Sequence, residues 1–331
     1  SSSIDSAIAP TRIIAFGDAM ADVGQKGSGY TVNDGSLFNW TQQLASHYGL
    51  VLKPVSAGGT SYAQGNARIS ATPDAAGNAG TPTVKQQIDQ FLANPQFKAD
   101  DVILISAGAS DIIAGMAAVQ AAAQTEAQYV AATGQAGKDL AAQIGRLSDA
   151  GAKHIVVTGS YDLERSPWAK ALGKQALIHQ ASLSFNDELK VAIKDMGKTV
   201  LYVDLAYYVN LFEANPGGNG FNNGKDPVCT SADAGPGIGI GAGQVNSALC
   251  TPSTIVAGAD YNRYVFADKV YLTPNAQRLF GDPDFMLHVV TRDLGAFQLL
   301  YDRELSRLPG VLRLSSTLVM KSIVADRPLP L

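Results

Sequence analysis

The sequence is poor in charge, in cysteine and in histidine. Charged residues make up 16% of its 331 positions, the formal net charge is −4, and there are 2 cysteines and 4 histidines. No basic stripe is present, which argues against nucleic acid as a partner. No apolar run reaches the length of a membrane span, and no phosphate-binding glycine loop, metal cluster or nicotinamide fingerprint occurs. We therefore expect no cofactor, no metal and no transmembrane span.

The chain is rich instead in apolar and small residues. Hydrophobic residues make up 46% and there are 33 glycines, which is typical of a globular protein with a substantial core. Abundant glycine and alanine, with few lysines, favour an exported bacterial protein, whether periplasmic, on the cell surface or secreted. The chain starts at Ser1 without a methionine, which removal of a leader or trimming would explain.

Cys229 and Cys250 bracket a loop rich in glycine, alanine, proline and serine. A disulfide between them fits an exported protein, and two buried free thiols are the alternative. We favour the disulfide, because a long flexible loop gains most from closure. Two cysteines alone do not complete a zinc shell, and no histidine lies near them in the sequence.

Short aliphatic runs alternate with helical stretches along the chain. The predicted strands are 12–16, 102–106, 154–158 and 199–204, and such apolar runs are typical of a parallel sheet covered on both faces. The predicted helices are 36–48, 83–92, 111–150 (as two helices broken near 134–137), 170–196 and 275–291. This order predicts an α/β protein with a three-layer α/β/α sandwich around a doubly wound parallel sheet.

We expect one domain over residues 1–292 and a C-terminal extension over 293–331. Within the domain, 215–258 is a long loop rich in glycine, proline and asparagine. Loops of this length usually have a function, so we expect it near the mouth of a site or at a partner surface. The extension has a less regular sequence, and we expect it to dock on the body or to contact a protein partner.

Four stretches stand where an ester hydrolase needs its catalytic groups. Two follow predicted strands, one follows a further extended stretch, and the last precedes the predicted helix 275–291. They are 13–24 (IIAFGDAMADVG), 58–68 (GGTSYAQGNAR), 106–112 (SAGASDI) and 266–274 (FADKVYLTP). In this order they resemble the GDSL, or SGNH, hydrolase family, in its branch of bacterial secreted lipases and esterases. The resemblance implies a flavodoxin-like α/β/α fold with its site at the carboxyl edge of the sheet.

The resemblance assigns each catalytic role to one residue, and three of these residues lack the usual chemistry. The nucleophilic serine falls on Ala19, whose methyl group cannot attack a carbonyl. The oxyanion asparagine falls on Ser110, whose hydroxyl can donate a hydrogen bond but is shorter than an amide. The histidine, three residues after the acid Asp268, falls on Tyr271. A phenol with an ordinary pKa of ~10 is a poor general base at neutral pH.

The other positions have supporting roles in this interpretation. The N–H of Gly58 or Gly59, with the N–H at position 19, would form a partial oxyanion hole. Asp18 and Asp111 would stabilise turns through Asx-type bonds to backbone N–H groups. We expect the histidines to be ordinary surface or half-buried residues, since none follows a strand at the site edge; they are His47, His154, His179 and His288.

These departures leave two interpretations open. Natural drift would make the chain a non-hydrolytic family member, a pseudoenzyme with a binding or scaffolding role at the former active-site cleft. The alternative is a carboxylic ester hydrolase whose nucleophilic serine was deliberately replaced by Ala19. We favour the first, because a deliberate inactivation has no reason to alter Ser110 and Tyr271 as well. The loops around the site are mostly uncharged, so the expected ligand is a neutral acyl ester, a glycan or a polypeptide.

Overall fold

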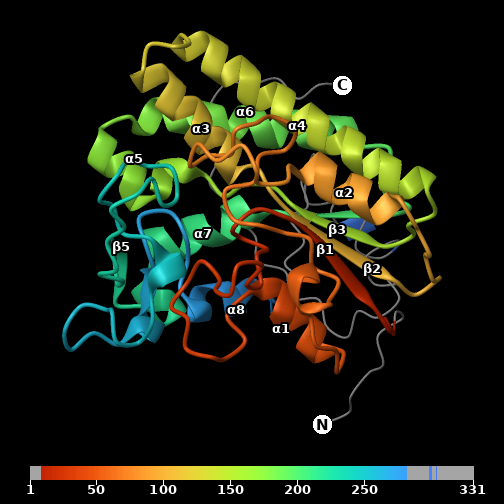
Figure 1. Ribbon diagram of the computed structural model, residues 1–331, viewed down its shortest axis with the longest axis horizontal. Coiled ribbons are helices and arrows are strands. Elements are labelled where there is room, and N and C mark those ends of the chain that lie inside the picture. Colours follow the sequence, from red (N-terminus) through yellow and green to blue (C-terminus); the bar gives the residue numbers. More distant parts are fainter. Residues whose placement is uncertain (1–8, 282–297, 300–302, 304–331) are drawn as a thin grey trace. The chain divides into compact units, whose positions relative to one another are not determined.

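A parallel sheet of four strands forms the centre of the fold (Figure 1). The strands are β1 (Ile13–Gly17), β2 (Val102–Ser106), β3 (Ile155–Thr158) and β4 (Val200–Val203), side by side in this order. Every residue of β1 and β2 is buried, as expected where apolar side chains point to both faces of a covered sheet. All four predicted strands are therefore confirmed, with ends that shift by one residue or none.

The computed structural model describes residues 9–281, 298, 299 and 303. Every element named below belongs to the larger of two compact units, Pro10–Leu287. Within the described part of the chain, no helix combines the length and the apolar composition that crossing a bilayer requires.

A short segment extends the sheet on the far side of β1. Ser61 forms a parallel bridge with Ala15. The N–H of Tyr62 donates to the carbonyl of Ala15 at 2.7 Å, and the N–H of Gln64 donates to that of Gly17 at 3.1 Å. β1 therefore lies inside the sheet, between this edge segment and β2, and later parts of the chain add to the sheet on both sides of it. This is the flavodoxin-like order that the family resemblance implies.

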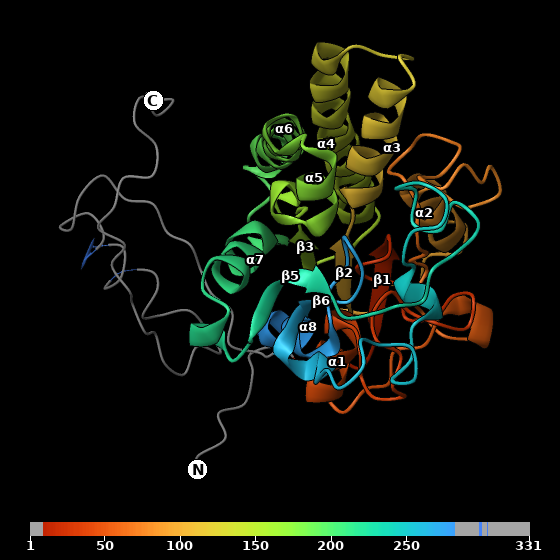
Figure 2. The same ribbon diagram turned by 90° about the vertical axis from the view of Figure 1, so that its left-hand side faces the viewer.

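Helices cover both faces of the sheet and give the fold three layers (Figures 1 and 2). One face carries α2 (Val84–Leu92), α3 (Ala109–Gln120), α4 (Glu126–Asp149) and α6 (Gln175–Ile193), and the other carries α1 (Trp40–His47) and α8 (Pro274–Gly281). The remaining helices are α5 (Pro167–Leu172) after β3 and α7 (Leu205–Ala214) after β4. A separate two-stranded sheet pairs β5 (Asn223–Pro227) with β6 (Tyr264–Phe266).

The main core lies between the sheet and the layer of α2, α4 and α6. Alternate side chains of β1, β2 and β3 point into it, and apolar residues of the three helices pack against them. The period-2 alternation of a strand sends the intervening residues to the opposite layer. Both faces are therefore buried, which explains the continuous apolar runs of the sequence.

Helix starts follow capping signals in the sequence. Thr83 begins α2 and Thr125 begins α4, each in a capping box with the glutamine three residues later. Asn39 caps α1, so this helix is shorter than the predicted 36–48. The predicted 83–92 is confirmed to within its capping residue.

Two predictions about helix boundaries are wrong. The break within 111–150 lies between Gln120 and Glu126, whereas Gly137 lies inside α4. Gly137 allows α4 to approach α6 closely, because a Cβ there would lie 2.3 Å from the carbonyl oxygen of Phe185. The predicted helix 170–196 is interrupted at Gly173, which adopts a left-handed conformation and ends α5. The later part of the predicted helix 275–291 and the boundary at residue 292 lie outside the described residues.

The predicted disulfide between Cys229 and Cys250 is present. The two residues are 21 positions apart in sequence, their Cα atoms are 5.9 Å apart, and both are buried. The alternative of two free thiols is therefore wrong. Around the bridge, Val228 packs with Val32 and Ala267 in a small apolar cluster. The disulfide thus closes the loop 215–258 on itself. The N–H of Cys229 donates to the carbonyl of Ala267 at 2.9 Å, which places the loop next to the segment that carries Asp268 and Tyr271.

Candidate functional site

The chain brings five of the residues singled out from the sequence to the carboxyl edge of the sheet, and all five are almost fully buried. Asp18 and Ala19 follow β1, Ser110 lies in the first turn of α3 after β2, and Asp268 and Tyr271 follow β6. Their exposed fractions are 0% or 1%. A substrate approaching from solvent therefore meets none of these side chains in this conformation.

Asp18 lies against the start of α3. Its N–H donates to the carbonyl of Ser106 at 3.0 Å, and its Oδ1 accepts the N–H of Met20 at 3.1 Å, which is an Asx turn. Burial raises the pKa of Asp18 to about 7, and the backbone N–H groups of Met20 and Ser110 offset part of this shift. The role in turn formation that we expected is therefore present, and the carboxyl is also unusually easy to protonate.

Asp268 is held by backbone groups. Its Oδ1 accepts the N–H of Val270 at 2.8 Å and of Tyr271 at 2.7 Å, and its Oδ2 accepts the N–H of Ser247 at 3.1 Å. Burial raises its pKa, and these hydrogen bonds oppose the shift. Ser247 belongs to the loop 215–258, so this loop lies beside the site, as the sequence predicts.

Tyr271 fills the place that the resemblance gives to a histidine. Its side chain is fully buried, and its ring packs edge-on against Tyr30 with centroids 5.7 Å apart. Its hydroxyl has no hydrogen-bond partner among the described residues. Burial raises the pKa of Tyr271 well above its ordinary value, so the phenol stays neutral and cannot accept a proton as a histidine would.

Ser110 offers a hydroxyl without an activating neighbour. It is fully buried, and its Oγ has no hydrogen-bond partner among the described residues. A serine nucleophile needs a base within hydrogen-bond reach. Ser110 therefore lacks the contact that would make it reactive.

The structure does not bring Gly58 and Gly59 to this edge. The hydroxyl of Thr60, the next residue, donates to the carbonyl of Ile13, at the amino end of β1. The N–H of Gly58 donates to Val55 and that of Gly59 to Pro54, both at 2.9 Å. The two glycines thus lie near the amino end of β1, away from the site, and their N–H groups already donate to other carbonyls. The prediction that one of them helps to form an oxyanion hole is therefore wrong.

The glycine of this block that reaches the carboxyl edge is Gly65. It follows Gln64, which is bonded to Gly17, and its N–H donates to Oδ2 of Asp22 at 2.7 Å. Burial raises the pKa of Asp22 to about 6. Counting residues along the strand from its pairing with β1 could have identified Gly65, but that pairing is not visible in the sequence.

Asp111, in the first turn of α3, binds a neighbouring loop. Its Oδ2 accepts the N–H of Ile69 at 2.8 Å and its Oδ1 accepts Nε of Arg68 at 3.2 Å. These bonds fasten the loop after Gly65 to the start of α3. Asp111 therefore stabilises a neighbouring loop, which differs from the Asx-type bond within its own turn that we expected.

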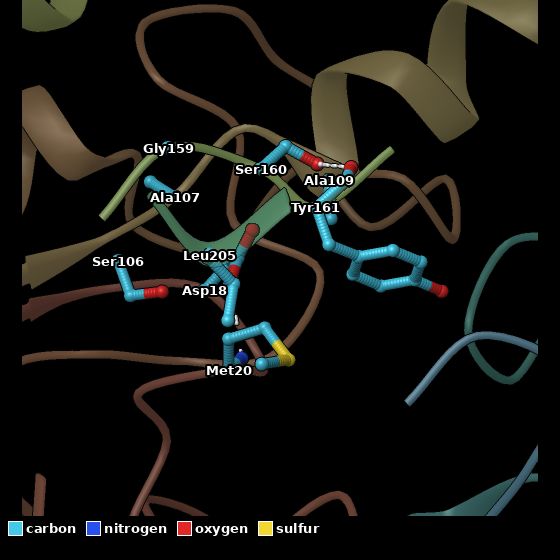
Figure 3. A pocket seen from close by; sticks show the side chains of 9 residues that line it. All are labelled: Asp18, Met20, Ser106, Ala107, Ala109, Gly159, Ser160, Tyr161 and Leu205. Atoms are coloured by element: carbon cyan, nitrogen blue, oxygen red, sulfur yellow. Dashed lines mark hydrogen bonds between the residues drawn. The ribbon is translucent and has the colours of Figure 1, made fainter. Parts of the chain in front are cut away.

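A small cavity lies at the ends of β1, β2 and β3 (Figure 3). Its volume is about 10 Å³, and its lining residues are Asp18, Met20, Ser106, Ala107, Ala109, Gly159, Ser160, Tyr161 and Leu205. This is room for about one water molecule. Pockets for organic ligands usually measure roughly 300–1,000 Å³. The cavity beside Asp18 is therefore too small for an organic ligand.

The sheet order and the residues gathered at its carboxyl edge define an α/β/α protein of the SGNH hydrolase fold. The sequence profile of the GDSL-like lipase/acylhydrolase family matches residues 13–283. The chain belongs to this family.

Individual relatives are more distant. A GDSL esterase/lipase of Arabidopsis thaliana is 28% identical over 134 residues, which is 38% of this chain and 33% of that protein. The crystal structure of a lipolytic G-D-S-L family member from Veillonella parvula aligns with 82% of this chain and 93% of its own, at 13% identity and a TM-score of 0.40.

A second similarity concerns the C-terminal part. The profile of the Lrp/AsnC ligand binding domain matches residues 273–329. A Bkd operon transcriptional regulator of Pseudomonas aeruginosa is 33% identical over 69 residues, which is 20% of this chain and 45% of that protein. The chain thus spans a third and under a half of the length of these two curated relatives.

Proposed function

We propose that this chain is a non-hydrolytic member of the GDSL family, a pseudoenzyme that serves in binding or scaffolding. One observation carries the proposal: at a single site, Ala19, Ser110 and Tyr271 stand where the family resemblance puts the nucleophile, the oxyanion amide and the base. Acyl transfer through a serine uses the nucleophile, a base that takes its proton, and donors to the oxyanion of the substrate. Their joint replacement removes each step of that chemistry.

The surroundings of the three residues support the proposal. Tyr271 is packed as a core side chain, and the carboxylate of Asp268 is bonded to backbone N–H groups instead of to a base. The cavity beside Asp18 holds about one water. A site that had kept its substrate would be expected to keep a cleft.

The small cavity also limits the binding role. A neutral acyl ester, a glycan or a polypeptide does not fit a cavity of about 10 Å³. Such a ligand would have to contact the outer surface of the loops or enter after they move. We propose the loop 215–258 as the element that such a ligand contacts, because it is fastened by the disulfide and bonded to Asp268 through Ser247.

We also propose that the protein is exported, in a bacterium. The Cys229–Cys250 disulfide supports this, because disulfides persist in oxidising compartments and are rare in the cytosol.

An ester hydrolase whose serine has been replaced by Ala19 remains the second candidate. Family membership and the relative described as an esterase/lipase favour it. It requires Asp268 and Tyr271 to work without an imidazole. The buried, neutral phenol of Tyr271 counts against this candidate.

For the extension 293–331 we propose a separate binding role. The match of residues 273–329 to a ligand binding domain supports it. Removal of the residues after Asp293 should change the oligomer size or the solubility of the protein, as measured by size-exclusion chromatography. Unchanged behaviour would remove the reason for this role.

Hydrolysis of p-nitrophenyl esters with short and medium acyl chains tests the main proposal. We expect the purified chain to release p-nitrophenol at the rate of a heat-denatured sample. Turnover that disappears on unfolding would show that the chain is an enzyme.

A further inference from the structure

Three ligand-type side chains converge beside the loop that follows β3. Asp162 and Glu164 belong to the short 3₁₀ helix η2 (Leu163–Arg165) and its cap, and His179 lies in α6. The ring nitrogen Nδ1 of His179 is 2.5 Å from Oδ2 of Asp162 and 3.0 Å from Oε2 of Glu164. The three ligand atoms lie within 4.8 Å of one another.

Among the described residues, the carboxylate of Glu164 shares its donor, Nδ1 of His179, with Asp162. A ring nitrogen carries at most one proton, so Nδ1 cannot give a full hydrogen bond to both carboxylates at once. Among the described residues, no lysine or arginine forms an ion pair with Asp162 or Glu164, since Arg165 is paired with Glu213. A cation among the three atoms would satisfy the imidazole and both carboxylates together.

One of the two distances suits a metal ion, and the other needs a small movement. Ligand atoms at ~2.1 Å from an ion lie about 3.0 Å apart at a right angle and about 3.4 Å apart at a tetrahedral angle. The separation of Nδ1 from Oε2 of Glu164 already fits. The pair with Asp162 has to open by roughly 0.5–0.9 Å to reach this geometry, and a turn of the His179 side chain, which is 39% exposed, supplies such a movement.

Hydrogen bonds hold the backbone around the three side chains, and one side of the cluster is open to solvent. Oδ1 of Asp162 accepts the N–H of Glu164, and Oγ of Ser182 in α6 accepts the N–H of Leu163. The first bond orients the carboxylate of Asp162, as hydrogen bonds to metal ligands do, and the second holds η2 against α6. Asp162 is 5% exposed and forms the floor, whereas the side chain of Glu164 is 33% exposed. An ion can therefore enter from solvent.

We propose that Asp162, Glu164 and His179 bind one divalent transition-metal ion of the Zn²⁺ type. Imidazole and carboxylate ligands without thiolates suit Zn²⁺ and its neighbours in the first transition row. The ion keeps at least one coordination position toward solvent. It fastens the loop after β3 to α6, and this loop includes Tyr161, which lines the cavity at the former catalytic edge.

This site differs from the expectation of no metal drawn from the sequence. Glu164 and His179 are separated by a helix and a turn, so no short ligand motif reveals the cluster. The inference does not depend on whether the chain hydrolyses esters.

Isothermal titration of the EDTA-treated, desalted full-length chain with ZnCl₂ tests the site. We expect one Zn²⁺ per chain and a rise in melting temperature on binding. His179→Gln and Glu164→Gln should each weaken this binding by a factor of ten or more. The control is His47→Gln, which changes an exposed histidine on α1 and should leave the affinity unchanged.

Two further measurements separate a loss of metal binding from a loss of folding. The melting temperatures of the metal-free variants show whether they are folded, and bound Co²⁺ gives a visible absorption spectrum that His179→Gln should abolish. Absence of Zn²⁺ binding overturns the proposal. Binding that persists unchanged in both His179→Gln and Glu164→Gln, or that is lost in His47→Gln, places the ion elsewhere and overturns it as well.

Discussion

The backbone N–H of Tyr271 donates to the carboxylate oxygen Oδ1 of Asp268 at 2.7 Å, so Asp268 is joined to the backbone of Tyr271 and not to its hydroxyl. The turn keeps the acid and the third residue after it close together. The side chain of Tyr271 is buried in the core and packs on Tyr30. In our proposal this turn keeps the family's backbone arrangement while its catalytic groups are replaced.

Tyr271→Phe tests the packing role of this residue. The hydroxyl is buried without a partner among the described residues, so its removal should leave the free energy of unfolding unchanged or raise it by up to about 1 kcal/mol. Tyr271→Ala should lower it by ~3–5 kcal/mol through loss of the ring. Urea denaturation measures both. A loss of more than about 2 kcal/mol in Tyr271→Phe would reveal a hydrogen bond of the hydroxyl.

Asp18→Asn should change how stability depends on pH. The pKa of Asp18 is about 7 in the folded chain, above its ordinary value of 3.8. The folded state therefore keeps a proton that the unfolded state releases between these values. The stabilisation is complete below pH 4 and is lost as the pH rises through 7, with a slope of at most about 1.4 kcal/mol per pH unit.

Denaturation of Asp18→Asn between pH 4 and 8 measures this effect. The variant should lose that part of the slope, because an amide does not titrate. Asp195→Asn, at an exposed position, is the matched control and should keep the slope of the unmodified chain. Equal slopes in Asp18→Asn and the unmodified chain would show that Asp18 is charged when folded.

Gly137→Ala tests the close contact between α4 and α6. Alanine favours a helix by ~1 kcal/mol over glycine, yet a Cβ at this position would lie 2.3 Å from the carbonyl oxygen of Phe185. We expect a net loss of about 1–3 kcal/mol in the free energy of unfolding. Gly145→Ala, in the same helix, meets only Met196 Cε at 3.7 Å and should raise it. Stabilisation by both changes would contradict the close packing.

Removal of the disulfide should weaken the fold. Cys229→Ser combined with Cys250→Ser opens a loop whose ends are 21 positions apart in sequence. The chain-entropy relation gives a loss of ~3 kcal/mol. Dithiothreitol should lower the stability of the unmodified chain by a similar amount and leave the double variant unaffected. A double variant as stable as the unmodified chain would mean that the loop is held by its packing alone.

The sheet was predictable because its strands carry uninterrupted apolar runs such as Ile13–Gly17, which few other structures accommodate. Helix ends were less predictable. Gly137 looked like a break, but it serves a contact with Phe185, 48 positions further along the chain. Contacts between distant segments leave no local signal, so a glycine needed for packing resembles one needed for a turn.

The candidate site was likewise predictable in part. The turns with Ala19 and Ser110 could be placed because each follows a predicted strand, and Tyr271 could be placed from the family resemblance. The assignment of the oxyanion role to Gly58 or Gly59 was wrong, because it depended on how the edge segment aligns with β1. The closed cavity and the metal-type cluster depend on the positions of side chains in space, and no sequence pattern gives these.

The most direct test of the central claim is the ester-hydrolysis rate of Ala19→Ser. If the chain is a pseudoenzyme, this variant should be as inactive as the unmodified chain, because Ser110, Tyr271 and the closed cavity remain. The combination with Ser110→Asn and Tyr271→His is the accompanying variant in which any activity should first appear. If Ala19→Ser alone raises kcat/KM by orders of magnitude, only the nucleophile was missing, and the chain is an esterase.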